Sequence, residues 1–428
     1  MDETKLEYAF SMETSSIKYG PGVTKEVGYE MRRLGARRVM LVTDPRLNDS
    51  EPVSIALQSL RDEGIDVVVF DQVSVEPTDV SFKEAIKFAT DGGFDGYVAV
   101  GGGSSMDTAK AANLYATHPA DFLAYVNAPI GEGRAVPGPL KPLIAIPTTS
   151  GTGSETTGVA IFDLLEMKAK TGIAHRALRP VMGIVDPNNT RTLPKMVAAC
   201  SGFDVLCHGI ESFTALPFGK RAAPKSPEMR PAYQGSNPLS DVWAVRAIEM
   251  VSQYMVRAVK DPSDEEARSQ MLLAATFAGC GFGNAGCQLP HAMSYPVAGM
   301  VRDFRPEGYP EGHPIIPHGM SVVLNAPAVF RFTAPADPDR HLYASRLMGA
   351  NTSGASPEDA GKLLAGAVIE LMRQVDIPNG LNRVGYSDAD VDALVAGAIP
   401  QKRLIDLVPR SVSEEDLERL YLESMSVW

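Results

Sequence analysis

The chain has 428 residues, of which 44% are hydrophobic and 21% are charged, and its formal net charge is -12. This length and balance predict a soluble globular protein of two or three domains. The excess of acidic groups argues against nucleic acid and acidic membrane surfaces as partners, and no apolar run approaches the roughly 18 residues of a membrane span.

The opening residues and the cysteines predict a cytoplasmic protein. The sequence begins MDETKLEYAF, which is acidic and lacks both the apolar core of a secretory signal and the arginine-rich pattern of a mitochondrial presequence. The four cysteines include no CxxC pair and lack the spacing of a disulfide framework. Reduced, buried thiols are therefore expected, and these favour an intracellular compartment.

The first half of the chain alternates short β-rich runs with helical segments. Strands are predicted at 16–19, 38–43, 66–70, 96–100 and 141–147, and helices before 35, at 51–63 and at 81–91. Shorter strands at 160–162, 170–174 and 183–185 are predicted to form a β-rich insertion. This alternation is typical of a parallel sheet with helices on both faces.

A glycine-rich turn follows the predicted strand at 96–100. Glycines allow close backbone approach, and the helix that follows offers free N–H groups to a pyrophosphate. The turn does not match the G-x-G-x-x-G fingerprint. The prediction that it binds a pyrophosphate therefore depends on its position after a strand of the α/β run. The predicted cofactor residues of this turn are Gly102, Gly103, Ser104 and Asp107.

Two other strand ends carry polar residues that suit a dinucleotide. Asp44 follows the strand at 38–43, where a carboxylate can accept from ribose hydroxyls, or can simply cap a turn. Thr148, Thr149 and Thr152 follow the strand at 141–147 and can bind ribose or phosphate oxygens, or can form a helix cap with Glu155.

From residue 193 onward the pattern is helical almost to the end. We therefore predict an α/β domain at 1–192 and an all-helical domain at 193–428, with the active site between them. Helices are expected at 195–216, 238–259, 265–280, 319–330, 338–348, 358–375, 388–397 and 414–426.

Four residues of this helical half can bind a metal ion. Asp204 and His208 stand four apart, which places them on one face of a helix. Taken alone, this pair also fits an ordinary amphipathic helix with a core histidine. His291 and His318 lie in small-residue or apolar surroundings, where an unpaired imidazole is costly. One Asp and three His suit Fe(II), Zn(II) or Mn(II).

These stretches resemble the iron-containing (group III) alcohol dehydrogenases. The blocks that match include GGGSSMDTAKAANLYA, PTTSGTGSETTGVAIFD, SGFDVLCHGIES and PHG, and within the family they are most similar to the hydroxyacid-oxoacid transhydrogenases. The resemblance implies a Rossmann-like, dinucleotide-binding domain followed by an all-α domain, as in dehydroquinate synthase-like folds. It also implies a homodimer.

The resemblance assigns roles to individual residues. Asp204, His208, His291 and His318 become the metal ligands, Fe(II) being expected and Zn(II) the alternative. Asp44 favours NAD over NADP, and Lys170 matches a lysine near the cofactor ribose, although a solvated lysine fits equally. Where many members carry a second histidine four positions after His291, this chain has Tyr295. Tyr295, His313 or water is then expected to replace that histidine in proton transfer.

The transhydrogenase resemblance implies that a hydroxy acid such as 4-hydroxybutyrate reduces a bound NAD. A 2-oxo acid such as 2-oxoglutarate then takes the hydride, which predicts ping-pong kinetics. Both substrates are carboxylates and need a cation in the site. The candidates, each of which can also be a surface charge, are Lys220, Arg221, Arg230, Arg302 and Arg305.

Three other functions remain open from the sequence. The first is an ordinary NAD-dependent, metal-dependent alcohol dehydrogenase that releases NADH. The second is a lyase related to the dehydroquinate synthases, which would need a phosphate-binding cluster of Lys and His that the sequence does not offer. The third is a non-catalytic nucleotide or metal sensor, which complete ligand and cofactor stretches disfavour.

Overall fold

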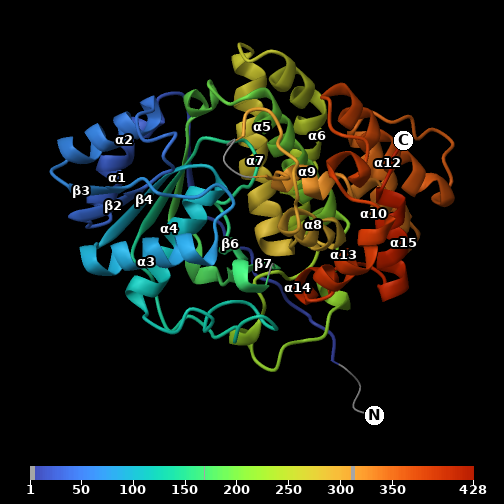
Figure 1. Ribbon diagram of the computed structural model, residues 1–428, viewed down its shortest axis with the longest axis horizontal. Coiled ribbons are helices and arrows are strands. Elements are labelled where there is room, and N and C mark those ends of the chain that lie inside the picture. The colour runs from blue at the N-terminus through green and yellow to red at the C-terminus, as the bar shows by residue number, and fades with distance from the viewer. Residues whose placement is uncertain (1–4, 168, 310–313) are drawn as a thin grey trace. The chain divides into compact units, whose positions relative to one another are not determined.

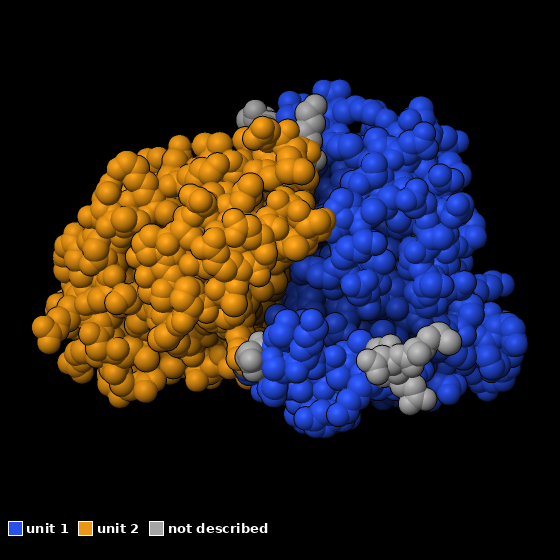
Figure 2. All heavy atoms as spheres, turned by 90° about the horizontal axis from the view of Figure 1, so that it is seen from below, with its two compact units in different colours: residues 1–13, 194–428 blue, residues 14–193 orange. Residues whose placement is uncertain are grey.

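The computed structural model describes residues 5–167, 169–309 and 314–428, and these form two compact units (Figure 2). One unit is Thr14–Leu193, and the other combines Pro194–Trp428 with the residues before Thr14. The sequence instead assigns residues 1–192 to one domain. The difference arises because the Ser11 amide donates to Gln234 Oε1 and the Glu13 amide donates to Asn284 Oδ1, at 2.9 and 3.0 Å.

The unit Thr14–Leu193 is built on a parallel sheet (Figure 1). Within the described residues its strand order is β1-β8-β5-β4-β2-β3. The strands are β1 (Ser16–Tyr19), β2 (Arg38–Val42), β3 (Asp66–Phe70), β4 (Gly96–Gly101), β5 (Leu143–Pro147) and β8 (Met182–Val185). Since these strands are all parallel, the loops that follow β2, β4 and β5 lie together at the carboxyl ends of the strands.

Helices cover both faces of this sheet. Alternate strand residues such as Val98 and Ile144 pack with α1 (Val27–Arg33) and α2 (Glu51–Asp62). The residues between them, such as Tyr97 and Ala99, pack with α3 (Asp79–Gly92) and α4 (Gly103–Thr117). This is the two-sided arrangement that the alternating pattern predicts.

The predicted β-rich insertion is only partly correct. β6 (Val159–Leu164) and β7 (Ala169–Ala174) form an antiparallel hairpin of their own. β8, in contrast, pairs with β1 and β5 in the main sheet, so its assignment to the insertion is wrong. Its run of four buried residues, MGIV, is the pattern of a strand inside a parallel sheet, not of a hairpin edge.

The second unit is helical. Two of its long helices begin behind side-chain caps, Asn237 before α6 and Asp264 before α7, whose side chains accept from the amides of Ser240 and Ala267. Its helices are α5 (Lys195–Phe213), α6 (Pro238–Lys260), α7 (Glu265–Ala285), α8 (Leu289–Gly299), α9 (His318–Val323), α10 (Ala326–Thr333), α11 (Pro338–Leu347), α12 (Ala360–Gln374), α13 (Val391–Ala398), α14 (Lys402–Ile405) and α15 (Glu414–Ser424).

Two neighbourhoods in this unit matter for function. The buried helix α5 packs against α6, α7 and α9, and α8 packs against α9, α13 and α14 (Figure 1). The single helix expected at 319–330 is in fact α9 and α10, divided at Leu324 and Asn325. Among the described residues, none of the helices has the length and apolar character needed to cross a bilayer.

Candidate active site

Asp204 and His208 lie on the innermost helix of the second unit. From Gly202 to Phe213 every residue of α5 is buried, so the helix is apolar on all sides apart from a few polar groups. The carboxylate and the imidazole project from adjacent turns, with Asp204 Oδ1 and His208 Nε2 3.5 Å apart. The His208 ring stacks on Phe282 of α7, with their centroids separated by 3.7 Å, which fixes its orientation.

Two further histidines converge on the same carboxylate oxygen. His291 of α8 and His318, the first residue of α9, present their Nε2 atoms to Asp204 Oδ1 at 3.5 and 3.7 Å. Asp204, His208 and His291 are each at least 96% buried, whereas a quarter of the His318 side chain is exposed. The structure therefore brings together all four predicted ligands, from three helices.

The spacing and chemistry of these atoms suit a divalent cation. Ligand atoms about 2.1 Å from one tetrahedral ion stand roughly 3.4 Å apart. Among the described residues, Asp204 Oδ1 and His291 Nε2 are buried and have no hydrogen-bond partner. Burial favours protonation of Asp204, but the three imidazoles outweigh it and hold the pKa of the carboxyl well below its usual range. Burial lowers the pKa of His208 to about 3. Burial acts in the same direction on His291, but Glu211 and Asp204 outweigh it and raise the pKa of His291 to about 9, so a cation that binds there displaces a proton.

Glu211 holds one of these ligands in place. This fully buried carboxylate on α5 places Oε1 2.7 Å from His291 Nδ1, while its Oε2 accepts from the Gln288 amide. The bond directs His291 Nε2 toward Asp204, which is the usual arrangement behind a histidine ligand. From the sequence alone, an exposed helix position fits Glu211 at least as well as this role does.

Cys287, which the sequence did not single out, also lies beside the cluster. Its sulfur and one ring nitrogen each of His208 and His291 lie within 4.8 Å of one another. Cys207 shares the helical face of Asp204 and His208, but from the sequence a small core thiol fits it better than a further ligand. Burial raises the pKa of both thiols well above the usual value. Neither is therefore a thiolate at neutral pH unless a cation binds beside it.

Tyr295 lies one turn beyond His291 on α8. Its ring centroid is 6.5 Å from that of His318, and its hydroxyl accepts a hydrogen bond of 2.7 Å from Arg403 Nη2. It therefore lies close enough to the cluster to replace the histidine of other members. His313, the other candidate for that role, lies outside the described residues.

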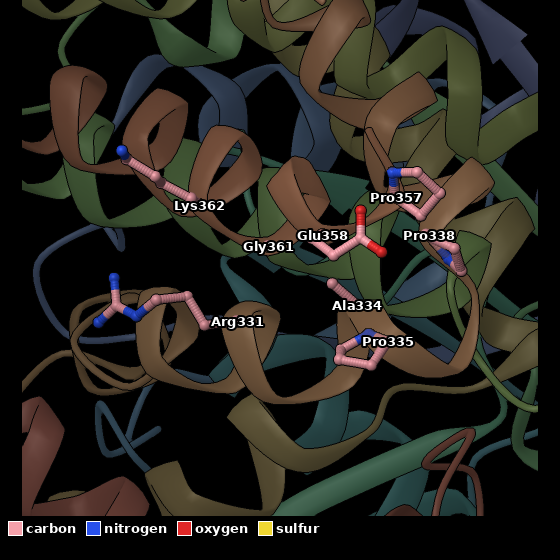
Figure 3. A pocket seen from close by; sticks show the side chains of 8 residues that line it. All are labelled: Arg331, Ala334, Pro335, Pro338, Pro357, Glu358, Gly361 and Lys362. Carbon is pink, nitrogen blue, oxygen red and sulfur yellow. The ribbon is translucent and has the colours of Figure 1, made fainter. Parts of the chain in front are cut away.

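The predicted cations in the long loops are occupied elsewhere or exposed. Arg230 pairs with Glu7 at 3.0 Å, and Arg302 pairs with Asp390. Arg221 donates to the carbonyl of Tyr233, while Lys220 and Arg305 are exposed. A pocket of about 470 Å³ at the ends of α10, α11 and α12 includes Arg331, Glu358 and Lys362, but none of the predicted site residues (Figure 3).

The predicted cofactor loops of the first unit lie against each other. A Cβ on Gly103 would be 2.7 Å from Thr152 Cγ2, and one on Gly102 would be 3.2 Å from Thr149 Cγ2. Side chains at either position would force the two loops apart, so the glycines are required for packing as well as for any ligand. Thr148 follows directly, its amide bonded to the Gly101 carbonyl.

A buried network joins these two loops beneath the surface. Asp107 accepts from Ser154 Oγ at 2.7 Å and from the Ile161 amide at 3.0 Å. The fully buried Lys110, which the sequence analysis missed, also bonds Ser154 Oγ and the Val159 carbonyl. The i, i+3 spacing of Asp107 and Lys110 places both side chains on one face of α4, and this pattern could have indicated their contact from the sequence.

The remaining predicted cofactor residues are partly engaged with protein groups. Ser104 accepts from the Glu76 amide at 3.2 Å. Asp44 follows β2 and accepts from the Arg46 amide, and burial raises its pKa. The Lys170 ammonium lies between Glu76 and Asp163 at 2.7 and 3.1 Å. Their roles toward NAD remain predictions.

The sequence matches two family models in tandem. The model "iron-containing alcohol dehydrogenase" covers residues 14–187, and the model of the C-terminal part of the Fe-containing alcohol dehydrogenase family covers residues 232–425. The chain belongs to the iron-containing alcohol dehydrogenase family. The predicted two-part architecture, Rossmann-like and then helical, is confirmed with it.

The chain is similar along its length to curated relatives. It is 55% identical to the mitochondrial hydroxyacid-oxoacid transhydrogenase of Mus musculus and 54% identical to that of Homo sapiens, over 99% of this chain and 91% of each relative. It is 52% identical to the probable mitochondrial enzyme of Dictyostelium discoideum, over 99% of this chain and 80% of that one. The predicted resemblance is confirmed.

Solved structures of the family agree. A 1,3-propanediol oxidoreductase superposes with a TM-score of 0.85 at 27% identity, covering 97% of this chain and 100% of that one. A sulfoacetaldehyde reductase from Bifidobacterium kashiwanohense, solved in complex with NAD+, gives a TM-score of 0.80 at 25% identity, with 99% and 100% covered.

The predicted cytoplasmic location is wrong. The curated relatives quoted above are mitochondrial proteins. The prediction depended on the character of the first residues, which does not determine the compartment. The four buried thiols fit any reducing compartment, so they do not distinguish one from another.

Proposed function

We propose that the protein holds one divalent cation through Asp204, His208, His291 and His318. Fe(II) is the proposed ion, with Zn(II) as the alternative, because one carboxylate oxygen and three imidazole nitrogens suit both. A cation bound there supplies Lewis acidity that stabilises negative charge on the substrate oxygen during hydride transfer. The geometry that supports this proposal is the approach of three Nε2 atoms to one Asp204 oxygen.

We further propose that the enzyme is a hydroxyacid-oxoacid transhydrogenase. It transfers a hydride from a hydroxy acid resembling 4-hydroxybutyrate to a 2-oxo acid resembling 2-oxoglutarate, through NAD that stays bound. The observation that carries this proposal is identity of 52–55% to transhydrogenases over 99% of the chain. Asp44 would accept from the adenosine ribose, and Lys170 would lie near the cofactor ribose. The pyrophosphate would bind at the turn of Gly102, Gly103 and Ser104, which Asp107 supports from below, and Thr148, Thr149 and Thr152 would bind ribose or phosphate oxygens.

Tyr295 is the proposed proton-transfer group. Its phenol lies beside His318, and its hydroxyl accepts a hydrogen bond from Arg403. We also propose that the enzyme is a homodimer, which sedimentation at micromolar concentration would test.

The test of function is a two-substrate assay of metal-loaded enzyme without added NAD. We expect 4-hydroxybutyrate and 2-oxoglutarate to be converted with parallel lines in double-reciprocal plots, as a ping-pong sequence requires. An enzyme that needs added NAD and releases one NADH per alcohol oxidised would instead be an ordinary dehydrogenase. That result would refute the transhydrogenase proposal.

Glu211→Gln is expected to weaken metal binding by about 10- to 100-fold. The amide keeps the shape of the buried carboxylate but removes the charge that supports the His291 Nδ1–H. Competition with a chelator of known affinity measures the effect. Glu249→Gln, a partly exposed position on α6, is the matched control and should bind metal as the wild type does.

A further inference from the structure

Arg403 is a cation with an unusual lack of acidic partners. It lies on α14, which packs against α8 (Figure 1), and its Nη1 is buried without a hydrogen-bond partner in the described part of the chain. No Asp or Glu among those residues forms an ion pair with it. A guanidinium in such surroundings is costly unless an anion joins it.

Its surroundings connect it to the metal site. Nη2 donates to the hydroxyl of Tyr295 at 2.7 Å, and the ring of Tyr295 lies beside His318. The guanidinium also lies over the ring of Tyr233, 5.4 Å from its centroid. Tyr295 therefore spans the space between one proposed metal ligand and the cation.

We propose that Arg403 binds the carboxylate of the substrate while the reacting carbon lies at the metal site. The inference rests on the proposed function, because only carboxylate substrates require such a group. Nη1 supplies an unused donor, and a planar guanidinium suits a carboxylate better than an ammonium does.

One cation at this position serves both half-reactions. In 4-hydroxybutyrate and in 2-oxoglutarate alike, two methylene groups separate the oxygen-bearing carbon from the distal carboxylate. The two acids can therefore occupy the same position in turn, each with its reacting carbon at the metal site. The charges agree too, since a divalent ion balances the Asp204 and Glu211 carboxylates, so that Arg403 supplies the positive charge for the substrate carboxylate.

The cations predicted from the sequence do not compete for this role. Arg230 and Arg302 are neutralised by Glu7 and Asp390, and Arg305 is exposed and donates to a backbone carbonyl. Arg403 differs from Arg230 and Arg302 in lacking an acidic partner, from Arg305 in having a buried Nη1, and from all three in its hydrogen bond to Tyr295.

The test compares Arg403→Met and Arg403→Lys with the wild type, and uses Arg305→Met as the control. Metal-loaded enzyme is mixed with NAD and either 4-hydroxybutyrate or 1,4-butanediol, in which a hydroxymethyl group replaces the carboxylate. The rate of nicotinamide reduction in a single turnover, measured at increasing donor concentration, gives the second-order rate constant for each donor. Calorimetry measures binding of glutarate, which lacks a reactive oxygen, and thermal unfolding reports on the fold.

For Arg403→Met we expect a loss of about 10- to 100-fold with the hydroxy acid and in glutarate affinity, with no change for the diol. Arg403→Lys should recover part of the loss, Arg305→Met should lose nothing, and the melting temperature of the Met variant should not fall. Equal losses for acid and diol, together with a lower melting temperature, would mean a structural role and overturn the proposal. Unchanged glutarate binding in the Met variant, or no glutarate binding by the wild type, would also overturn it.

A different result would refute the proposed transhydrogenase function. A wild-type enzyme that transfers no hydride between the two acids, yet binds glutarate through Arg403, refutes the transhydrogenase activity and leaves the carboxylate site standing. The calorimetric comparison is therefore informative whichever substrate is used.

Discussion

Asp204→Asn is expected to lose its metal ion and at least about 1000-fold in kcat/KM. Asp204 supplies the sole anionic ligand of the proposed set, and its Oδ1 is the atom that all three Nε2 atoms approach. The amide preserves the volume of the side chain in a fully packed helix but offers a neutral oxygen. Elemental analysis of the purified protein gives the metal content, and steady-state kinetics with saturating metal gives the activity.

Asp388→Asn is the matched control, since it makes the same chemical change at an exposed position of the same unit. It should retain one ion per chain and full activity. An Asp204→Asn protein that retains stoichiometric metal and activity would refute the four-residue site. A variant that binds no metal but keeps its activity would show that the metal bound by these four residues is not needed for catalysis.

Much of this architecture follows from local patterns. The strand at 66–70 matches β3 because DVVVF is an unbroken β-branched run between polar residues. The helix α5 matches because LPK marks its start and its apolar residues continue for several turns. Asp204 and His208 could be paired from the sequence since both lie on that one helix. His291 and His318 stood out by their small-residue or apolar surroundings, and the family resemblance then assigned all four residues as ligands.

The sequence-based predictions fail where the structure depends on contacts between segments that are far apart in the chain. The sequence predicts no helix at 289–299, where Pro290 and Pro296 occur, yet Pro290 occupies the first turn of α8 and burial stabilises the remainder. Arg403 lies on the four-residue helix α14, and no pattern there indicates that it will meet Tyr295, 108 positions earlier. Contacts of that kind depend on tertiary packing.

Gly319 shows how packing sets the position of a ligand. It follows His318 at the start of α9, where that helix crosses α5. A Cβ at this position would lie 1.9 Å from the Cys200 carbonyl oxygen and 3.0 Å from Asp204 Cβ. Both obstacles belong to the buried helix α5, the first to its backbone, so α9 would have to move away.

Gly319→Ala is therefore expected to act on stability and on activity together. Overpacking of this kind costs about 3 kcal/mol of the free energy of unfolding. Because His318 moves with α9, a displacement of about 1 Å from Asp204 should lower kcat/KM about 100-fold. Chemical denaturation of the metal-free protein measures the first effect, and metal affinity and kinetics measure the second.

Gly366→Ala provides the matched control on the exposed side of α12, where a Cβ meets no atom within 4 Å. There the same methyl group should stabilise the protein by roughly 0.5–1 kcal/mol, because alanine favours the helix. The chemical change is identical at the two glycines. A free energy of unfolding that falls for Gly319→Ala and rises for Gly366→Ala would therefore locate the effect in the contact between α5 and α9. A Gly319→Ala variant with wild-type stability and metal affinity would show instead that the two helices can separate without moving His318, and that the glycine after this ligand is dispensable.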